Sequence, residues 1–532
     1  MSAPHFPSRR SAVLARQGMV ATSQPLAALA GLRILMDGGN AADAAVTVAA
    51  MLNVVEPMST GIGGDCFALI YEAQTGQVTA LNGSGRAPCG FTADEARRRG
   101  LQTIPFTGPL PVTVPGAASG WQALLDRFGK MTLANCLAPA IAAAETGFPV
   151  SERISAGWQR SAEKLSQDPE AARVYLPPPK PGDIHRQPDL ARTFRAVAEG
   201  GAHAFYRGEL AAKIAACVQS KGGYLTTDDL AAHTATWETP ISTTYRGVQV
   251  LEHPPNGQGL AALVALNIVE GYDLAEMDYY DPTRWHVMIE AMRLGMADAA
   301  RYVADPAVVE VAVAGLLAKK YAARRRALIQ PDRALELVAP GQPDHRDTVY
   351  LTVVDGQGNA VSFINSLYHG FGSGLVVPGT GICLQNRGAC FTLEPGHPNA
   401  LAGGKRPYHT IIPAMALRQG RLWLSFGVMG GFMQPQGHLQ VLTNLVDYQM
   451  NPQAALDAPR FRVHERGALQ VAIETGVPLK TRRALLAMGH DVQPETTFAP
   501  GFGSGDIIAR DPETGVLWGA SDPRKDGCAV GF

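Results

Sequence analysis

The chain has 532 residues, 46% of them hydrophobic, so it can bury a large core and form two closely packed parts or two domains. Its 46 basic and 47 acidic side chains balance, which argues against a protein that binds nucleic acid or an anionic membrane through its charge. The seven cysteines are odd in number and lack CxxC spacing, which excludes a disulfide framework and a zinc cluster.

The N-terminal segment does not have the pattern of an export signal. Residues 1–10 lack the apolar stretch of a secretory signal, and no uninterrupted apolar run reaches membrane-spanning length. We therefore expect a cytoplasmic protein with no membrane partner.

Small residues dominate the first two predicted helices. The sequence predicts a helix over 25–36, followed by a second helix that Asn40 caps and whose alanine stripe packs in the core. A glycine-rich loop, 57–65, then enters a predicted strand at 66–71. This loop has neither the lysine of a P-loop nor the spacing of a dinucleotide fingerprint, so we interpret it as a place of close backbone approach near the active site.

The middle of the chain is predicted to be mostly helical. A strand over 77–81 precedes it, and a strand over 243–251 interrupts it, because that stretch is rich in β-branched and aromatic residues. Periodic apolar residues predict helices over 117–128, 133–145, 188–200, 209–221, 259–271 and 284–300.

The most informative stretch is a predicted hairpin in the last third of the chain. Alternating residues predict a half-buried strand from Thr348 to Asp355, joined by a glycine-containing turn to a return strand from Ala360 to Ser366. If Asp355 pairs with Ala360, Thr348 lies beside Leu367 or Ser366, so two hydroxyl groups can meet at the open end. On its own the pattern is typical of an ordinary hairpin.

The segments on either side of this hairpin also carry signals. Residues 331–346 are proline-rich and lack apolar periodicity, which predicts an exposed tether before Thr348. A strand over 422–427 is predicted to run into Gly430 and Gly431, followed by a helix over 435–450.

Several short motifs, each weak alone, together carry a family resemblance. In chain order they are Asp37–Ala44, Gly61–Asp65, Val114–Gly116, Lys405–Pro407, Gly430–Gly431 and Gly519–Arg524. With the Thr348 hairpin they resemble the γ-glutamyltransferase family over almost the whole chain. The resemblance implies a four-layer αββα N-terminal-nucleophile hydrolase sandwich with additional helices. It also implies a proenzyme cut between Asp347 and Thr348 into subunits 1–347 and 348–532.

The resemblance further implies the catalytic residues. Thr348 would attack the Asp347 carbonyl during processing and later a substrate amide, with its freed α-amine, whose ordinary pKa is about 7.7–8.0, as the base. Ser366 would hydrogen-bond Thr348 and orient it. The backbone N–H groups of Gly430 and Gly431 would stabilise the oxyanion, although a plain strand-to-helix turn also explains them. The reaction needs no metal or other cofactor, and no paired-histidine motif is present.

The positions that would line the substrate pocket depart from the family's pattern. Arg387 replaces a residue that is not usually basic, Tyr368 stands where Asn is common, and His409-Thr410 replaces a pair of serines. Cys390 lies near the usual place of an acidic residue that binds the substrate α-amine, and a thiol cannot form that ion pair.

A second departure concerns the residue that binds the substrate α-carboxylate. Ser84 occupies the usual position of an arginine, and Arg86, two residues later, is either its substitute or a surface arginine.

We therefore predict a self-processing amidohydrolase acting on a small amide that carries a carboxylate, as oxamate does, with that carboxylate held by Arg387. Arg387 as a salt-bridge residue beside a pocket that it never touches is the structural alternative. A γ-glutamyltransferase or glutathione hydrolase is the alternative activity, cephalosporin-type acylases form another branch, and an unprocessed binding protein is the alternative class. The partners would be the substrate and the two subunits, with a homodimer of the processed unit left open.

Overall fold

The computed structural model describes residues 8, 10–336, 348–464 and 469–532, which form two seven-stranded antiparallel sheets. In spatial order, the β10 sheet contains β21 (Cys528–Gly531), β2 (Met19–Thr22), β10 (Val349–Val354), β11 (Ala360–Ser366), β3 (Asp65–Tyr71), β4 (Val78–Gly83) and β7 (Thr236–Glu238). The β15 sheet contains β1 (Val13–Ala15), β20 (Leu517–Ser521), β19 (Ser504–Arg510), β15 (Arg421–Met429), β14 (Ala414–Arg418), β9 (Val248–Glu252) and β8 (Ile241–Tyr245).

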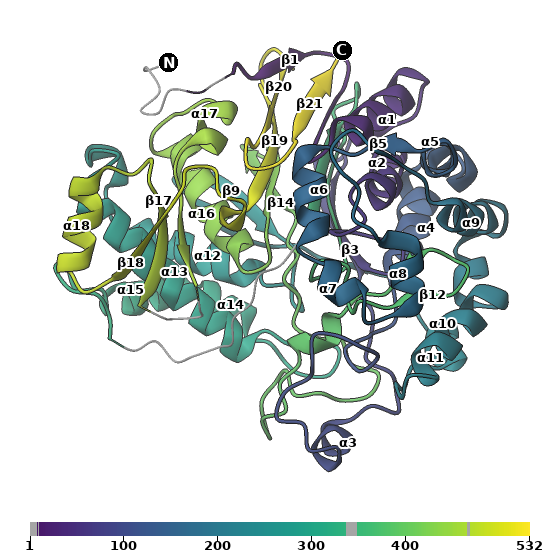
Figure 1. Cartoon of the computed structure of the whole chain (residues 1–532). Coiled ribbons are helices and arrows are strands. Elements are labelled where there is room, and N and C mark those ends of the chain that lie inside the picture. The colour runs from purple at the N-terminus through teal and green to yellow at the C-terminus, as the bar shows by residue number, and fades with distance from the viewer. Residues whose placement is uncertain (1–7, 9, 337–347, 465–468) are drawn as a thin grey trace.

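Helices cover the outer face of each sheet, and the two sheets pack against each other, which gives four layers (Figure 1). The β10 sheet is covered by α1 (Pro25–Met36), α2 (Ala41–Val55) and α4 (Ala117–Phe128), with α5 (Leu133–Thr146) and α9 (Pro188–Tyr206) packed on these helices. The β15 sheet is covered by α12 (Gly259–Val269), α16 (Met433–Val446) and α17 (Pro452–Asp457), with α13 (Pro282–Tyr302) packed on α12. The αββα architecture expected from the resemblance is confirmed.

The remaining elements surround this framework. The helices are α3 (Ala93–Arg98), α6 (Glu152–Gln159), α7 (Ala162–Leu165), α8 (Pro169–Tyr175), α10 (Glu209–Gln219), α11 (Thr227–Ala231), α14 (Val313–Leu317), α15 (Lys319–Arg326), α18 (Leu479–Ala487), η1 (Leu274–Glu276), η2 (Arg387–Cys390) and η3 (Pro500–Phe502). The strands are β5 (Phe148–Pro149), β6 (Ile184–His185), β12 (Val376–Val377), β13 (Ile382–Cys383), β16 (Phe461–Val463), β17 (Gln470–Glu474) and β18 (Asp491–Glu495). No helix in the described part of the chain is both long and apolar enough to span a membrane.

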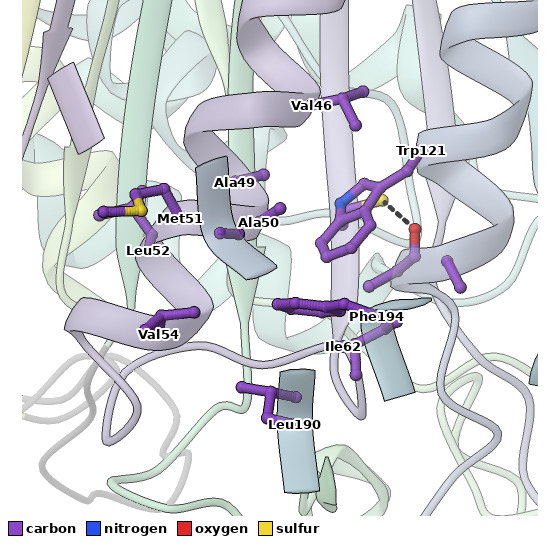
Figure 2. Packing of buried hydrophobic residues seen from close by; sticks show 14 of the residues in the cluster. Val46, Ala49, Ala50, Met51, Leu52, Val54, Ile62, Trp121, Leu190 and Phe194 are labelled. Atoms are coloured by element: carbon purple, nitrogen blue, oxygen red, sulfur yellow. Dashed lines mark hydrogen bonds between the residues drawn. The ribbon is translucent and has the colours of Figure 1, made fainter. Parts of the chain in front are cut away.

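Helix α2 forms the centre of one core, and all its residues are buried. Asn40 caps it as predicted, in a capping box with Asp43. Its alanines allow the helix to lie close to β10 and β11, and Figure 2 shows Ala49 and Ala50 among larger side chains such as Trp121. This packing fixes the inner strands of the β10 sheet between α2 and the second sheet.

The β10–β11 hairpin lies between two strands from the other end of the chain. Strand β10 pairs with β2, and β11 pairs with β3. Strands from before and after the expected cut therefore lie side by side in one sheet. Asp347, on one side of that cut, and residues 337–346 of the predicted tether lie outside the described residues.

Two local predictions are wrong. The stretch 243–251 is a hairpin rather than one strand, because Arg246 and Gly247, at φ of 50° and 80°, form a tight turn between β8 and β9. Strand β10 is fully buried rather than half-buried, because helices cover one face of its sheet and the β15 sheet covers the other. Its polar side chains find buried partners, and the Thr352 hydroxyl lies 2.5 Å from that of Ser425.

Candidate active site

The hairpin brings Thr348 and Ser366 together at its open end. Val354 pairs with Ala360, one residue away from the pairing assumed from the sequence, and Val349 pairs with Asn365. Thr348 therefore lies opposite Ser366, and their hydroxyl oxygens are 3.2 Å apart in a buried environment. Of the two neighbours that the sequence left open, Ser366 is the correct one.

The hydrogen bonds of Ser366 determine which hydroxyl donates. Its Oγ accepts from the backbone N–H of Tyr368 at 2.9 Å and from Nη2 of Arg387 at 3.3 Å. A hydroxyl oxygen has two lone pairs and one proton. Since both lone pairs are occupied, the Ser366 proton is donated to Thr348 Oγ1. This donation orients the Thr348 oxygen.

Arg387 is buried beside these hydroxyls and contacts three other predicted residues, namely Ser366, Tyr368 and Thr410. Its Nη1 donates to Thr410 Oγ1 at 2.7 Å, and its guanidinium lies 4.1 Å from the centre of the Tyr368 ring. Its Nε is buried and has no hydrogen-bond partner among the described residues. Tyr368 has a φ of 83°, an uncommon backbone conformation for a bulky residue. Arg387 thus hydrogen-bonds the hydroxyl next to Thr348, but it is fully buried and is not among the residues that line the cavity at Thr348, so its role in binding substrate stays a prediction.

His409 belongs to the same buried cluster but binds a carboxylate that sequence reasoning did not single out. Its Nε2 donates to Asp65 at 3.0 Å, while Nδ1 accepts from the backbone N–H of Ile411 at 3.3 Å. Burial lowers the pKa of His409 far below its ordinary value, with Arg387 adding to this effect, so the ring is neutral. The two bonds therefore fix one tautomer.

Asp65 opens β3 and pairs with Ser366 in the sheet register. Its carboxylate also accepts from the backbone N–H of Gly85 and from Gln385, both at 2.9 Å. Burial raises the pKa of Asp65 to about 6, although the nearby Arg387 charge acts against the shift. The sequence signal for Asp65 is its place at the end of the glycine-rich loop, where the sequence predicts close backbone approach near the active site but assigns no role to the carboxylate.

That loop does bring backbones close together, as predicted. A Cβ on Gly64 would lie 2.3 Å from the Ser366 carbonyl oxygen, and one on Gly63 would lie 2.2 Å from that of Cys383. Because only glycine fits at this spacing, the loop holds β11 and the following segment against β3.

Gly430 and Gly431 follow β15 and have φ angles of 120° and 59°. Their carbonyl oxygens are fixed by the N–H groups of Met433 and Gln434, and Gln258 also donates to Gly431. Within the described residues neither glycine N–H has a hydrogen-bond acceptor. Gly430 lies near Thr348, with which it lines a cavity, and available backbone N–H donors at such a place can stabilise an oxyanion.

Thr348 and Gly430 also line a cavity of about 100 Å³, and the buried cluster of Asp65, Ser366, Arg387 and His409 is not part of its lining. Arg153 of α6 and Arg160, the residue after that helix, are exposed at this cavity. Lys525 also lines it, and its Nζ donates to the Thr348 carbonyl at 3.1 Å and to Glu56 at 3.0 Å. Thr348 thus separates a buried polar cluster from an accessible cavity with cationic walls.

Arg86 is the predicted residue that the described hydrogen bonds do not join to this cluster. It is half-buried near Arg406, and burial together with the Arg86 charge lowers the pKa of Arg406 to about 10. Arg406 in turn donates to the Ser84 carbonyl at 3.0 Å. Arg86 therefore belongs to a neighbouring basic group.

Comparisons with known proteins agree with this geometry. A family model described as gamma-glutamyltranspeptidase matches residues 27–532. The chain is 39% identical over 527 residues to the glutathione hydrolase-like YwrD proenzyme of Bacillus subtilis strain 168, covering 98% of this chain and 99% of that protein. It is 36% identical over 540 residues to the oxamate amidohydrolase proenzyme of Klebsiella pneumoniae subsp. pneumoniae, covering 98% and 100%.

Solved structures show the same likeness in three dimensions. Cephalosporin acylase from Bacillus halodurans superposes with a TM-score of 0.93 at 46% identity, covering 100% of this chain and 99% of that one. The similarity in sequence and the similarity in fold to these proteins therefore both extend over almost the whole chain.

Proposed function

Because the chain belongs to the γ-glutamyltranspeptidase family of N-terminal-nucleophile hydrolases, we propose that it is a self-processing amidohydrolase whose nucleophile is Thr348. The observation that carries the proposal is the bond from the Ser366 hydroxyl to Thr348 Oγ1, beside the two available N–H groups of Gly430 and Gly431. A nucleophile, a residue that orients it and oxyanion donors are the parts that acyl transfer requires.

Processing would begin with the precursor, in which Thr348 has no free amine. Its Oγ attacks the Asp347 carbonyl carbon, the peptide C–N bond breaks, and an ester forms while the Thr348 amine is released. Water then hydrolyses the ester, which leaves a carboxylate on Asp347 and a free hydroxyl on Thr348. The products are the subunits 1–347 and 348–532.

Catalysis would use the released amine as the base. The amine takes the Thr348 hydroxyl proton as Oγ attacks the substrate amide, and the N–H groups of Gly430 and Gly431 receive the oxyanion. Losing one such donor typically costs about 3–4 kcal/mol of transition-state stabilisation. The proton passes to the leaving nitrogen as the C–N bond breaks, and water hydrolyses the acyl-enzyme.

We propose a small carboxylate-bearing amide of the oxamate type as the substrate. Guanidinium groups on both sides of Thr348 support this class, with Arg387 in the buried cluster and Arg153 and Arg160 at the cavity. Tyr368, His409 and Thr410 would shape the site around Arg387 rather than bind substrate alone, since each is buried and already hydrogen-bonded or stacked.

Two alternatives remain distinct from this proposal. A glutathione hydrolase or γ-glutamyltransferase would bind an α-amine near Cys390, a half-buried thiol that brings no negative charge. A binding protein that never matures would keep the chain whole. The similar proteins include a glutathione hydrolase-like proenzyme as well as an oxamate amidohydrolase proenzyme.

Incubation of the purified chain, followed by gel electrophoresis and N-terminal sequencing, tests the proposal. Wild type should yield two fragments, the smaller beginning at Thr348, whereas an intact wild-type chain would favour the binding protein. A panel of oxamate, γ-glutamyl anilide and simple acyl amides then tests the substrate. Strong γ-glutamyl turnover that is unchanged in Arg387→Ala would exclude the role given to Arg387.

A further inference from the structure

We infer that Lys525 and Glu56 act as a positioning pair that holds the Thr348 residue in place and sets the charge balance beside its α-amine. This inference rests on the function proposed for Thr348. Lys525 follows β20, whereas Glu56 is the residue immediately after α2. The pair therefore joins the two expected subunits.

The contacts form a continuous chain that ends on the nucleophile. The Ser23 hydroxyl donates to one oxygen of Glu56, and Lys525 Nζ donates to the other at 3.0 Å. The same ammonium donates to the Thr348 carbonyl oxygen at 3.1 Å. Glu56 is buried, so its orientation is fixed. After a cut before Thr348, this hydrogen bond and the strand pairing of β10 would still hold the new terminus.

The ammonium of Lys525 also lies close to the amine that the cut would release. Within one residue the nitrogen and the carbonyl oxygen are about 3–4 Å apart, so Nζ lies within about 7 Å of the Thr348 nitrogen. A positive charge at this distance disfavours protonation of the amine and lowers its pKa, while the Glu56 carboxylate acts in the opposite direction. The pair thus adjusts how much amine is available as a base near neutral pH.

Other ionisable groups face Thr348 from the elements around it. From the buried side come Arg387, Asp65 and the neutral His409, and from the cavity come Arg153, Arg160, Arg524 and Asp526. Arg524 is paired with Glu474 and Asp522. Of all these groups, Lys525 makes the direct hydrogen bond to the Thr348 backbone, so changes to it and to Glu56 should act most strongly on the amine.

The test compares two substitutions that change the local charge in opposite directions. Lys525→Met leaves the Glu56 charge and should move the acidic limb of the kcat–pH profile upward by about one unit, whereas Glu56→Gln leaves the ammonium and should move it downward. Lys525→Arg keeps the charge and should restore the wild-type profile. Lys480→Met, on the exposed start of α18, is the matched control and should leave the profile unchanged.

The measurement uses processed protein, with a free Thr348 terminus confirmed by sequencing before kcat and KM are recorded from pH 5 to 9. Loss of structure would lower the rate of a variant without shifting the acidic limbs of the Lys525→Met and Glu56→Gln profiles in opposite directions. The inference is overturned if these two acidic limbs shift in the same direction or do not shift. If Lys525→Met fails to mature, an unshifted or upward-shifted Glu56→Gln profile overturns it alone. Full activity without a free Thr348 amine would instead refute the proposed function.

Discussion

The two sides of Thr348 differ in how tightly their polar groups are held. On the buried side, the cluster of Asp65, Ser366, Arg387 and His409 is inaccessible, and each member is hydrogen-bonded to another. On the cavity side, Arg153 and Arg160 are exposed and form no salt bridge with any described residue.

This difference suggests that the buried side orients Thr348, whereas the cavity side contributes to substrate binding. A group held by several buried hydrogen bonds cannot move without breaking them, so it can fix where the nucleophile points. An exposed side chain adjusts to a ligand and pays rotamer entropy on doing so, so it contributes modestly to binding. We therefore expect changes on the buried side to lower kcat and changes on the cavity side to raise KM.

The largest effect is expected at the residue between the two sides. Thr348→Ala should abolish both processing and amide hydrolysis, because no hydroxyl remains to attack either bond. Thr348→Ser keeps the hydroxyl and should still be cut, at a reduced rate. Gel electrophoresis and ammonia release measure the two steps. A Thr348→Ala protein that still hydrolyses amides would place the nucleophile elsewhere.

Ser366→Ala tests the buried side directly. It removes the donor to Thr348 and leaves the Tyr368 N–H and Arg387 Nη2 without their acceptor, so kcat should fall by about 10²–10³ with little change in KM. Ser362→Ala on the same strand is the control, since its hydroxyl lies 2.8 Å from that of Tyr350 rather than near Thr348. Equal kcat losses in both variants would mean that damage to the strand, not orientation, explains the result.

The buried carboxylate predicts how stability depends on pH. Because burial raises the pKa of Asp65 from 3.8 to about 6, the folded protein binds this proton more tightly than the unfolded chain does. Between about pH 4 and 6 its contribution to the free energy of unfolding should fall as pH rises, by about 3 kcal/mol in total. In Asp65→Asn, the free energy of unfolding measured with urea should no longer fall between about pH 4 and 6. If it falls as steeply as in wild type, the raised pKa of Asp65 is contradicted.

The cavity side should give the smallest effects. Arg153→Ala and Arg160→Ala should each raise KM for carboxylate-bearing amides by up to about fivefold, and leave KM for a neutral amide unchanged. Arg207→Ala, an exposed arginine on another part of the surface, serves as the control. A fall in kcat rather than a rise in KM would show that these arginines act on the nucleophile.

How much of this site is predictable depends on distance along the chain. The Thr348–Ser366 pair follows from alternation in two strands joined by a short turn, with an uncertainty of one residue. The Asp65–His409 bond joins residues 344 positions apart, and no local pattern encodes such a contact. The sequence identified Arg387 and Tyr368 as unusual, but only packing shows that one stacks on the other.

The same reasoning explains the fold-level results. Helices α1 and α4 begin and end where their periodicity predicted, since their apolar stripes are local properties. The full burial of β10 depends on a second sheet formed by segments distant in the sequence. The alternation of polar and apolar residues within the strand cannot predict that this second sheet covers it.

The position of the β10–β11 hairpin between β2 and β3 has a consequence for the cleaved molecule that we propose. Two polypeptides that share a continuous ladder of backbone hydrogen bonds cannot separate while that ladder is intact, so they must unfold together. A cleaved preparation should therefore show a single calorimetric transition whose midpoint falls on dilution, because unfolding releases two chains, whereas the midpoint of the uncleaved Thr348→Ala chain should not depend on concentration.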